Sequence, residues 1–221
     1  MFGLHGFAIL MVVASVALVF AAAAWLFVRL LKREPRPLIP VAAALGGWTA
    51  LYLGTLAAVS LASEPRVLGI NEDKKFCGFY LDCHTGVAVT NVDTASRIGG
   101  VTAAGVFHVV TLRIGSDAVR AELELVEPRM RVHDAAGRAW DRSPAGEAAL
   151  AQARGSQPTL TEPLAPGASY TTTVVFDLPR DAAQPQLDVT VGFWAERLIE
   201  RFLIGDEDSW LHKPTTIRLP A

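Results

Sequence analysis

The N-terminal region most constrains this chain, because two long apolar stretches there flank a short basic loop. No Asp, Glu, Lys or Arg occurs between residues 7 and 28, and none between residues 38 and 62. At about 1.5 Å of rise per residue, each stretch is long enough as a helix to cross a hydrocarbon core of about 30 Å. We therefore predict a transmembrane helical hairpin over residues 1–62, with spans at about 7–31 and 38–62.

The charges around the two spans predict their orientation. The connecting loop carries four basic residues, Arg29, Lys32, Arg33 and Arg36, whereas only His5 precedes the first span. Cytoplasmic loops are enriched in Lys and Arg, so this loop is expected in the cytoplasm and both chain ends outside it. A cleaved signal peptide is the alternative for the first span. It is disfavoured because residues 1–6 lack Lys and Arg and because the apolar stretch is longer than a usual signal-peptide core.

The remainder of the chain, from residue 63 on, has the composition of one ordinary soluble domain of about 160 residues, which is enough to bury a core. The whole chain has a formal net charge of −2, and outside the loop it has no run of Lys and Arg. The basic surface of a nucleic-acid binder is therefore not expected. We predict a multi-pass protein of the inner (plasma) membrane, with a periplasmic or otherwise extracytoplasmic C-terminal domain.

Cys77 and Cys83 are the only cysteines, and they lie in residues 63–83, which we interpret as a linker and cysteine segment. In an oxidising compartment two cysteines this close are expected to form a local disulfide. The alternative is a redox or copper-type metal centre that uses both cysteines and His84. The spacing disfavours it, because the segment has no C-x-x-C pair, no haem-attachment motif and no set of ligands with zinc-site spacing downstream.

Residues 84–221 are predicted to form an all-β domain, an antiparallel immunoglobulin-like sandwich with one minor helix, because short alternating segments are separated by turn signals. The expected strands cover residues 84–92, 105–114, 123–127, 129–134, 138–141, 170–178, 187–193 and 215–219, and the expected helix covers 146–154. Residues 194–204 fit either a strand extension or a short helix. His108 falls on the mainly apolar face of its strand, where a hydrogen-bonded core or rim residue is expected.

Three stretches of this domain resemble a known family. They are Gly105-Val-Phe107-His-Val109-Val110; Asp134-Ala-Ala-Gly137 with Trp140-Asp141; and Leu164-x-Pro166-Gly167 followed by Val175-Phe176-Asp177-x-Pro179. Over residues 87–191 the chain is similar to bacterial and archaeal extracytoplasmic immunoglobulin-like domains of unknown function. The resemblance implies a sandwich fold and carries over no catalytic residue. This chain differs from that family in its two spans, its cysteine segment and its long tail.

One further group has ligand chemistry. Asp206, Glu207 and Asp208 form an acidic loop whose carboxylates suit Ca²⁺, but the residue order of an EF-hand is absent, so a solvated turn is favoured. The sequence also lacks a nucleophile elbow, a Walker loop and a dinucleotide fingerprint, and no cofactor is predicted.

The plan of two spans followed by an external sandwich is also similar to that of the copper-carrying second subunit of haem-copper oxidases. Its copper motif is missing here, because Cys77 and Cys83 precede the sandwich. The sequence therefore favours a non-enzymatic, membrane-anchored binding or scaffold module, or an accessory subunit of a membrane complex. Its expected partners are the lipid bilayer and another envelope or membrane protein. Nucleic acid is not expected, and a periplasmic redox or metal protein is the alternative.

Overall fold

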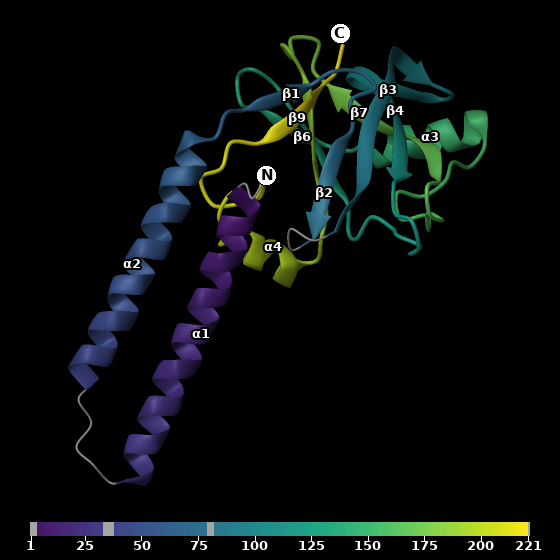
Figure 1. Ribbon diagram of the computed structural model, residues 1–221. Coiled ribbons are helices and arrows are strands. Elements are labelled where there is room, and N and C mark those ends of the chain that lie inside the picture. Colours follow the sequence, from purple (N-terminus) through teal and green to yellow (C-terminus); the bar gives the residue numbers. More distant parts are fainter. Residues whose placement is uncertain (1–3, 33–37, 79–81, 221) are drawn as a thin grey trace. The chain divides into compact units, whose positions relative to one another are not determined.

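The computed structural model describes residues 4–32, 38–78 and 82–220 (Figure 1). The chain divides into two compact units, which we call the helical unit and the sandwich unit. The helical unit comprises Met1–Glu64 and Leu198–Lys213, and the sandwich unit comprises Pro65–Arg197 and Pro214–Ala221.

The helical unit is built on two long apolar helices, α1 (Leu4–Leu31) and α2 (Leu38–Ala62). Both are long and apolar enough to cross a membrane, with mean hydropathy of 2.7 and 1.4 over their apolar windows. Only 11 % and 6 % of those windows is buried within the protein. A core helix of a soluble protein would be mostly buried, so these helices leave their apolar surfaces uncovered. By composition alone, α1 also suits a signal sequence.

Two hydrogen bonds involve Ser15 in the middle of α1. Ser15 Oγ donates to the carbonyl of Met11 at 2.8 Å, and the indole nitrogen of Trp48 donates to Ser15 Oγ at 2.9 Å. The second bond joins α1 to α2, as expected for helices that pack together in an apolar medium.

The sandwich unit contains two sheets. The first has the strand order β1-β9-β8-β5-β6, and the second has the order β2-β3-β4-β7. The strands are β1 (Arg66–Leu68), β2 (Lys74–Gly78), β3 (Asp82–Ile98), β4 (Val101–Ser116), β5 (Arg129–His133), β6 (Ala139–Asp141), β7 (Ser169–Leu178), β8 (Gln186–Thr190) and β9 (Thr215–Arg218). β1 pairs with β9 in parallel, and the other strand pairs are antiparallel.

The main core lies between the sheets, because alternate residues of each strand point inward. Val110, Leu112 and Phe176 come from one sheet, and Val132 and Leu187 come from the other; all are fully buried. This confirms the β-sandwich prediction and the central position of the strand that contains residues 105–114.

A second core lies on the outer face of the β2-β3-β4-β7 sheet. There α3 (Pro144–Arg154) packs Ala149 and Leu150 against Phe107, Val109 and Val175. Ser143 caps the helix, since its hydroxyl accepts a hydrogen bond from the backbone N–H of Gly146. The predicted helix at 146–154 is confirmed, but the expectation of a single minor helix is wrong, because Trp194–Glu200 forms a further short helix, α4.

Other local predictions are also corrected. Residues 63–83 are more than a linker, because β1 and β2 form within them. Residues 123–127 form no strand and make one isolated bridge, between Leu123 and Leu164. The strand predicted at 84–92 continues to Ile98, because residues 91–93, whose sequence resembles a turn, pair with residues 109–111 of β4.

Candidate functional site

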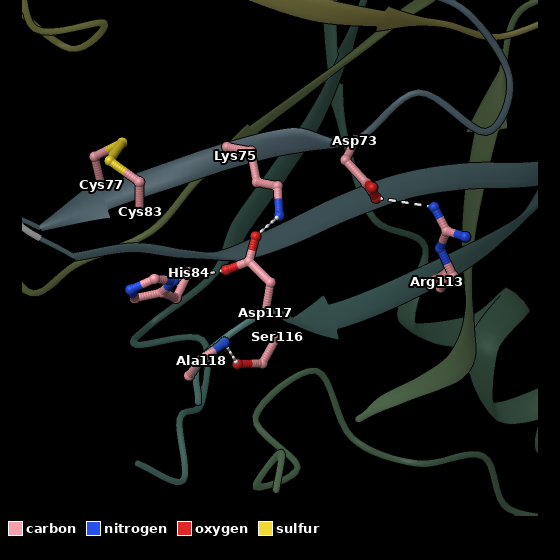
Figure 2. Close-up of polar contacts among 9 residues, drawn as sticks. All are labelled: Asp73, Lys75, Cys77, Cys83, His84, Arg113, Ser116, Asp117 and Ala118. Carbon is pink, nitrogen blue, oxygen red and sulfur yellow. Dashed lines mark hydrogen bonds and ion pairs between the residues drawn. A yellow bond between two sulfur atoms is a disulfide. The ribbon is translucent and has the colours of Figure 1, made fainter. Parts of the chain in front are cut away.

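The strongest local constraint on the sandwich unit is the hairpin of β2 and β3, which a disulfide closes near its tip (Figure 2). Cys77 and Cys83 are bonded, with an S–S distance of 2.03 Å. This confirms the predicted disulfide. Residues 79–81 at the tip lie outside the described residues. Because both sulfur atoms are in the bond, neither is a thiolate available to bind a metal.

A carboxylate beside this hairpin joins three segments of the chain. Asp117, which directly follows β4, accepts a hydrogen bond from Lys75 Nζ on β2 at 2.8 Å, and its other oxygen lies 2.7 Å from Nδ1 of His84 on β3. The backbone N–H of Asp117 also donates to the carbonyl of His84 at 2.9 Å. The Lys75 and His84 hydrogen bonds hold the pKa of Asp117 below its usual range.

A second ion pair extends this polar surface. Arg113 on β4 donates to Asp73 at 3.0 Å, on the same side of the hairpin as the Asp117 contacts (Figure 2). All five side chains are between 39 % and 58 % exposed. We call Asp73, Lys75, His84, Arg113 and Asp117 the charge cluster.

The charge cluster gathers basic and acidic side chains on three neighbouring segments: the β2 region, the start of β3 and the end of β4. Exposed pairs of this kind contribute little to stability, with a median of about 0–1 kcal/mol. They do give a partner with complementary charges a defined pattern to match.

Metal binding finds no geometric support in the part of the chain that the structure describes. No group of three or more His, Cys, Asp or Glu side chains is arranged there to hold an ion. His84 lies next to Cys83 in the chain, but its imidazole is engaged with Asp117.

The acidic loop lies in the helical unit. Asp206 is buried, and its carboxylate accepts a hydrogen bond from the backbone N–H of Asp208 at 2.9 Å. Burial, with a smaller effect from the charges of Asp208 and Glu207, raises the pKa of Asp206 to about 6 against that hydrogen bond. Because burial disfavours the ionised form, this carboxylate already carries a cost when charged. Ca²⁺ binding by Asp206, Glu207 and Asp208 stays a prediction.

Two of the four predicted topology residues are described. The guanidinium of Arg29 lies 5.2 Å from the centroid of the Trp25 ring, a cation–π distance, at the end of α1. The backbone N–H of Lys32 donates to the carbonyl of Val28 at 3.1 Å, which continues the helix to the start of the loop. Arg33 and Arg36 lie outside the described residues.

The structure also reveals a buried lysine that the sequence does not indicate. Lys74 lies at the start of β2, yet its ammonium reaches the other sheet, where it donates to the carbonyl of Thr215 at 2.8 Å and lies 3.5 Å from Asp188. These partners are more than a hundred residues away in the chain. No local pattern could have identified them.

An open hollow with a volume of about 450 Å³ lies beside α3. Threonines and the Arg142–Glu147 pair line it. That pair is bidentate, at 2.7 and 2.8 Å, so its donors and acceptors satisfy one another. The charges of that pair are therefore matched to each other within the wall of the hollow.

No protein-family model matches this chain, and no curated protein matches it. Several solved structures match part of the chain at low identity. A conserved hypothetical protein from Bacillus anthracis is 16 % identical over 55 % of this chain and 89 % of its own, with a TM-score of 0.42. The secreted protein MPT63 from Mycobacterium tuberculosis is 15 % identical over 60 % of this chain and 94 % of its own, with a TM-score of 0.42. An uncharacterized β-sandwich protein from Clostridium difficile 630 is 8 % identical over 72 % and 97 %, with a TM-score of 0.39. No functional residue is taken from these similarities.

Proposed function

We propose that this chain is a membrane-anchored, non-catalytic module of the cell envelope. In this proposal α1 and α2 cross the plasma membrane as a hairpin. The sandwich, of immunoglobulin-like type, lies outside the cytoplasm and binds another envelope or membrane protein. The observation that carries the proposal is the uncovered apolar surface of α1 and α2, of whose apolar windows only 11 % and 6 % is buried.

That surface is too large to be left in water. Leu10, Phe20, Leu31 and Ile39 are each at least 68 % exposed on the two helices. Removing one such side chain from water is worth about 1.5–3 kcal/mol, so the helices need an apolar surrounding that the rest of the protein does not supply. Lipid tails provide it, and the helix lengths match a bilayer.

The proposed orientation rests on the basic loop and on the disulfide. Arg29 and Lys32 follow the first span directly, so the positive-inside rule assigns the loop to the cytoplasm. The sandwich unit is then on the opposite side, where disulfides form and persist. The bond between Cys77 and Cys83 is consistent with that compartment.

We place the binding surface at the charge cluster, because it joins exposed charges of both signs on a covalently closed hairpin. A partner with complementary charges gains its specificity and association rate from such a pattern.

The test is site-specific photo-crosslinking in native membranes, with the full chain. A photo-reactive residue replaces Lys75 in the charge cluster and, as a matched control, Ala136 in the exposed turn between β5 and β6. We expect a discrete crosslinked partner from the Lys75 position and none from the Ala136 position. A chain that crosslinks to nothing at either position, or equally at both, would contradict the proposed surface.

A further inference from the structure

The segment Leu198–Lys213, which begins in the last turn of α4 and ends just before β9, carries several exposed apolar side chains. Leu198, Ile199, Phe202, Trp210 and Leu211 are between 43 % and 56 % exposed. Leu203 and Ile204 are buried on its other side. A soluble surface rarely gathers so many exposed large apolar side chains in so short a stretch, so this face indicates an apolar neighbour.

This segment belongs to the same compact unit as α1 and α2. The hydroxyl of Tyr52, within α2, donates to the carbonyl of Phe202 at 2.8 Å. At the end of α2, the backbone N–H of Lys213 donates to Ser63 Oγ at 2.9 Å. The segment therefore runs along α2 from the level of Tyr52 to the level of Ser63.

Burial along the helices supports that placement. Among the hairpin side chains that the structure describes, four are buried, Ala8, Met11, Leu56 and Ser60. All four lie toward the start of α1 or the end of α2, which is the end of the hairpin that the segment reaches. The remaining described hairpin positions are partly or fully exposed.

The length of α2 sets the depth of the segment. Tyr52 lies ten residues before the end of α2 at Ala62, which is about 15 Å of helix. If that part of α2 stood in water, residues 39–52 alone would span the membrane, and they cover only about 21 Å of a core of about 30 Å. The segment beside Tyr52–Ala62 therefore lies within the outer leaflet.

Backbone hydrogen bonding in the segment suits that environment, where unpaired polar groups are costly. The N–H groups of Phe202, Leu203, Asp206, Ser209, Trp210 and His212 all donate to carbonyls within the segment or within α4. Ser209 Oγ also donates to the carbonyl of Leu203. These six backbone donors are therefore paired, which lowers the cost of placing the segment at the membrane interface.

We propose that Leu198–Lys213 is an interfacial membrane segment that inserts its exposed apolar face into the outer leaflet beside α2. Lipid covers this apolar face, because the Tyr52–Phe202 and Ser63–Lys213 contacts make it continuous with the apolar surface of the spans. Trp210 has the amphipathic ring that prefers the membrane–water boundary. This inference rests on the proposed transmembrane hairpin.

The experiment is nitroxide accessibility at single added cysteines in the full-length protein, reconstituted in vesicles of phosphatidylcholine and phosphatidylglycerol. Cys77 and Cys83 are bonded to each other and do not compete for the label in the absence of reductant. The test position is Leu211→Cys, with Trp210→Cys as a second variant. Phe20→Cys, on a span, is the hydrocarbon reference, and Val119→Cys, 83 % exposed in the sandwich unit, is the aqueous reference.

We expect the label at residue 211 to collide more with lipid-soluble oxygen than with a water-soluble nickel chelate. The label at residue 20 should behave in the same way, and the label at residue 119 should collide more with the nickel chelate. A label at 211 that behaves as at 119, while the label at 20 stays in lipid, overturns the interfacial segment and leaves the hairpin standing. A label at 211 shielded from both reagents shows that protein covers this face and also overturns the proposal. If residue 20 itself behaves as aqueous, the hairpin proposal fails as well.

Discussion

The helical unit and the sandwich unit use the same apolar residue types in opposite ways. Phe176 and Leu112 in the sandwich are fully buried between two sheets, whereas Phe20 on α1 is 71 % exposed. One unit therefore makes its own apolar interior, and the other presents its apolar side chains to a surrounding medium. The comparison teaches that hydrophobic composition alone does not locate a core, because the medium around each surface decides what its apolar residues do.

The chain connects the two units three times, whereas two domains in tandem are connected by one linker. The chain passes between them at 64–65, at 197–198 and at 213–214. The helical unit thus includes a segment that runs from the last turn of α4 to the residue before β9. A fragment that begins at residue 65 would therefore contain Leu203 and Ile204 without the hairpin that belongs to the same unit.

The largest expected effect tests the difference in packing. Phe176→Ala should lower the free energy of unfolding of the sandwich by about 3–5 kcal/mol, because it removes a fully buried aromatic side chain between two sheets. Phe20→Ala, the same change on α1, should alter the free energy of unfolding of the detergent-solubilised protein by no more than about 0.5 kcal/mol. Equal losses at both positions, measured by chemical denaturation and circular dichroism, would show that α1 is packed inside protein.

A tight backbone contact in the sandwich gives the next effect. A Cβ added at Gly105 would lie 2.0 Å from the carbonyl oxygen of Leu178, whereas one at Gly100 would meet no atom within 4 Å. Gly105→Ala should therefore destabilise the sandwich by roughly 3 kcal/mol, since β4 and β7 must separate. Gly100→Ala should be close to neutral. The denaturation midpoints of the two variants compare them directly.

The disulfide should contribute about 2 kcal/mol, as expected for closing so short a loop. Cys77→Ser, Cys83→Ser and the double variant should then lose the same amount of stability, and reductant should have no further effect on them. The helical unit should be unchanged. Loss of a bound metal or of a titratable redox couple in these variants, with stability retained, would favour the redox alternative instead.

The smallest effect concerns pH, and its sign should differ between the units. Burial raises the pKa of Asp206 to about 6, so its contribution to the helical unit is fully present below about pH 4 and is lost as the pH rises through 6. Burial lowers the pKa of His108 in the sandwich, against a weaker effect from the Val106 carbonyl. That contribution is present above about pH 6.5 and is lost as the pH falls through the folded-state pKa.

Hydrogen exchange at several pH values separates the two responses. Asp206→Asn should protect amides of residues 203–212 by about 1 kcal/mol at neutral pH and by nothing near pH 4, because the amide keeps the hydrogen bond from Asp208 without the buried charge. His108→Gln should flatten the acid-induced loss of protection in β4. If amide protection changed in the same direction with pH in both units, the predicted difference between Asp206 and His108 would be wrong.

The sequence predicts those features that depend on local pattern. The uncharged lengths predict α1 and α2, and the alternation at 170–178 predicts β7. The capping Ser143 and the alanine-rich stretch after it fit α3. These elements form for reasons that are visible within a dozen residues.

Long-range contacts decide the elements that the sequence does not predict. β2 begins at Lys74, whose burial depends on Asp188 and Thr215 far along the chain. The charge cluster is assembled by Asp117 from two other strands. Residues 198–213 join α2 through a contact between Tyr52 and Phe202, 150 residues apart. The hydrophobic periodicity of a helix or strand indicates that one of its faces is covered, but it does not indicate which segment covers that face.

The sidedness of the sandwich is the most direct test of the account as a whole. In intact spheroplasts, a membrane-impermeant maleimide should label Val119→Cys in the sandwich without permeabilisation. It should label Glu34→Cys, in the basic loop, only after the membrane is opened. Labelling of Glu34→Cys from outside, with Val119→Cys protected until permeabilisation, would contradict an external sandwich carried by a membrane hairpin.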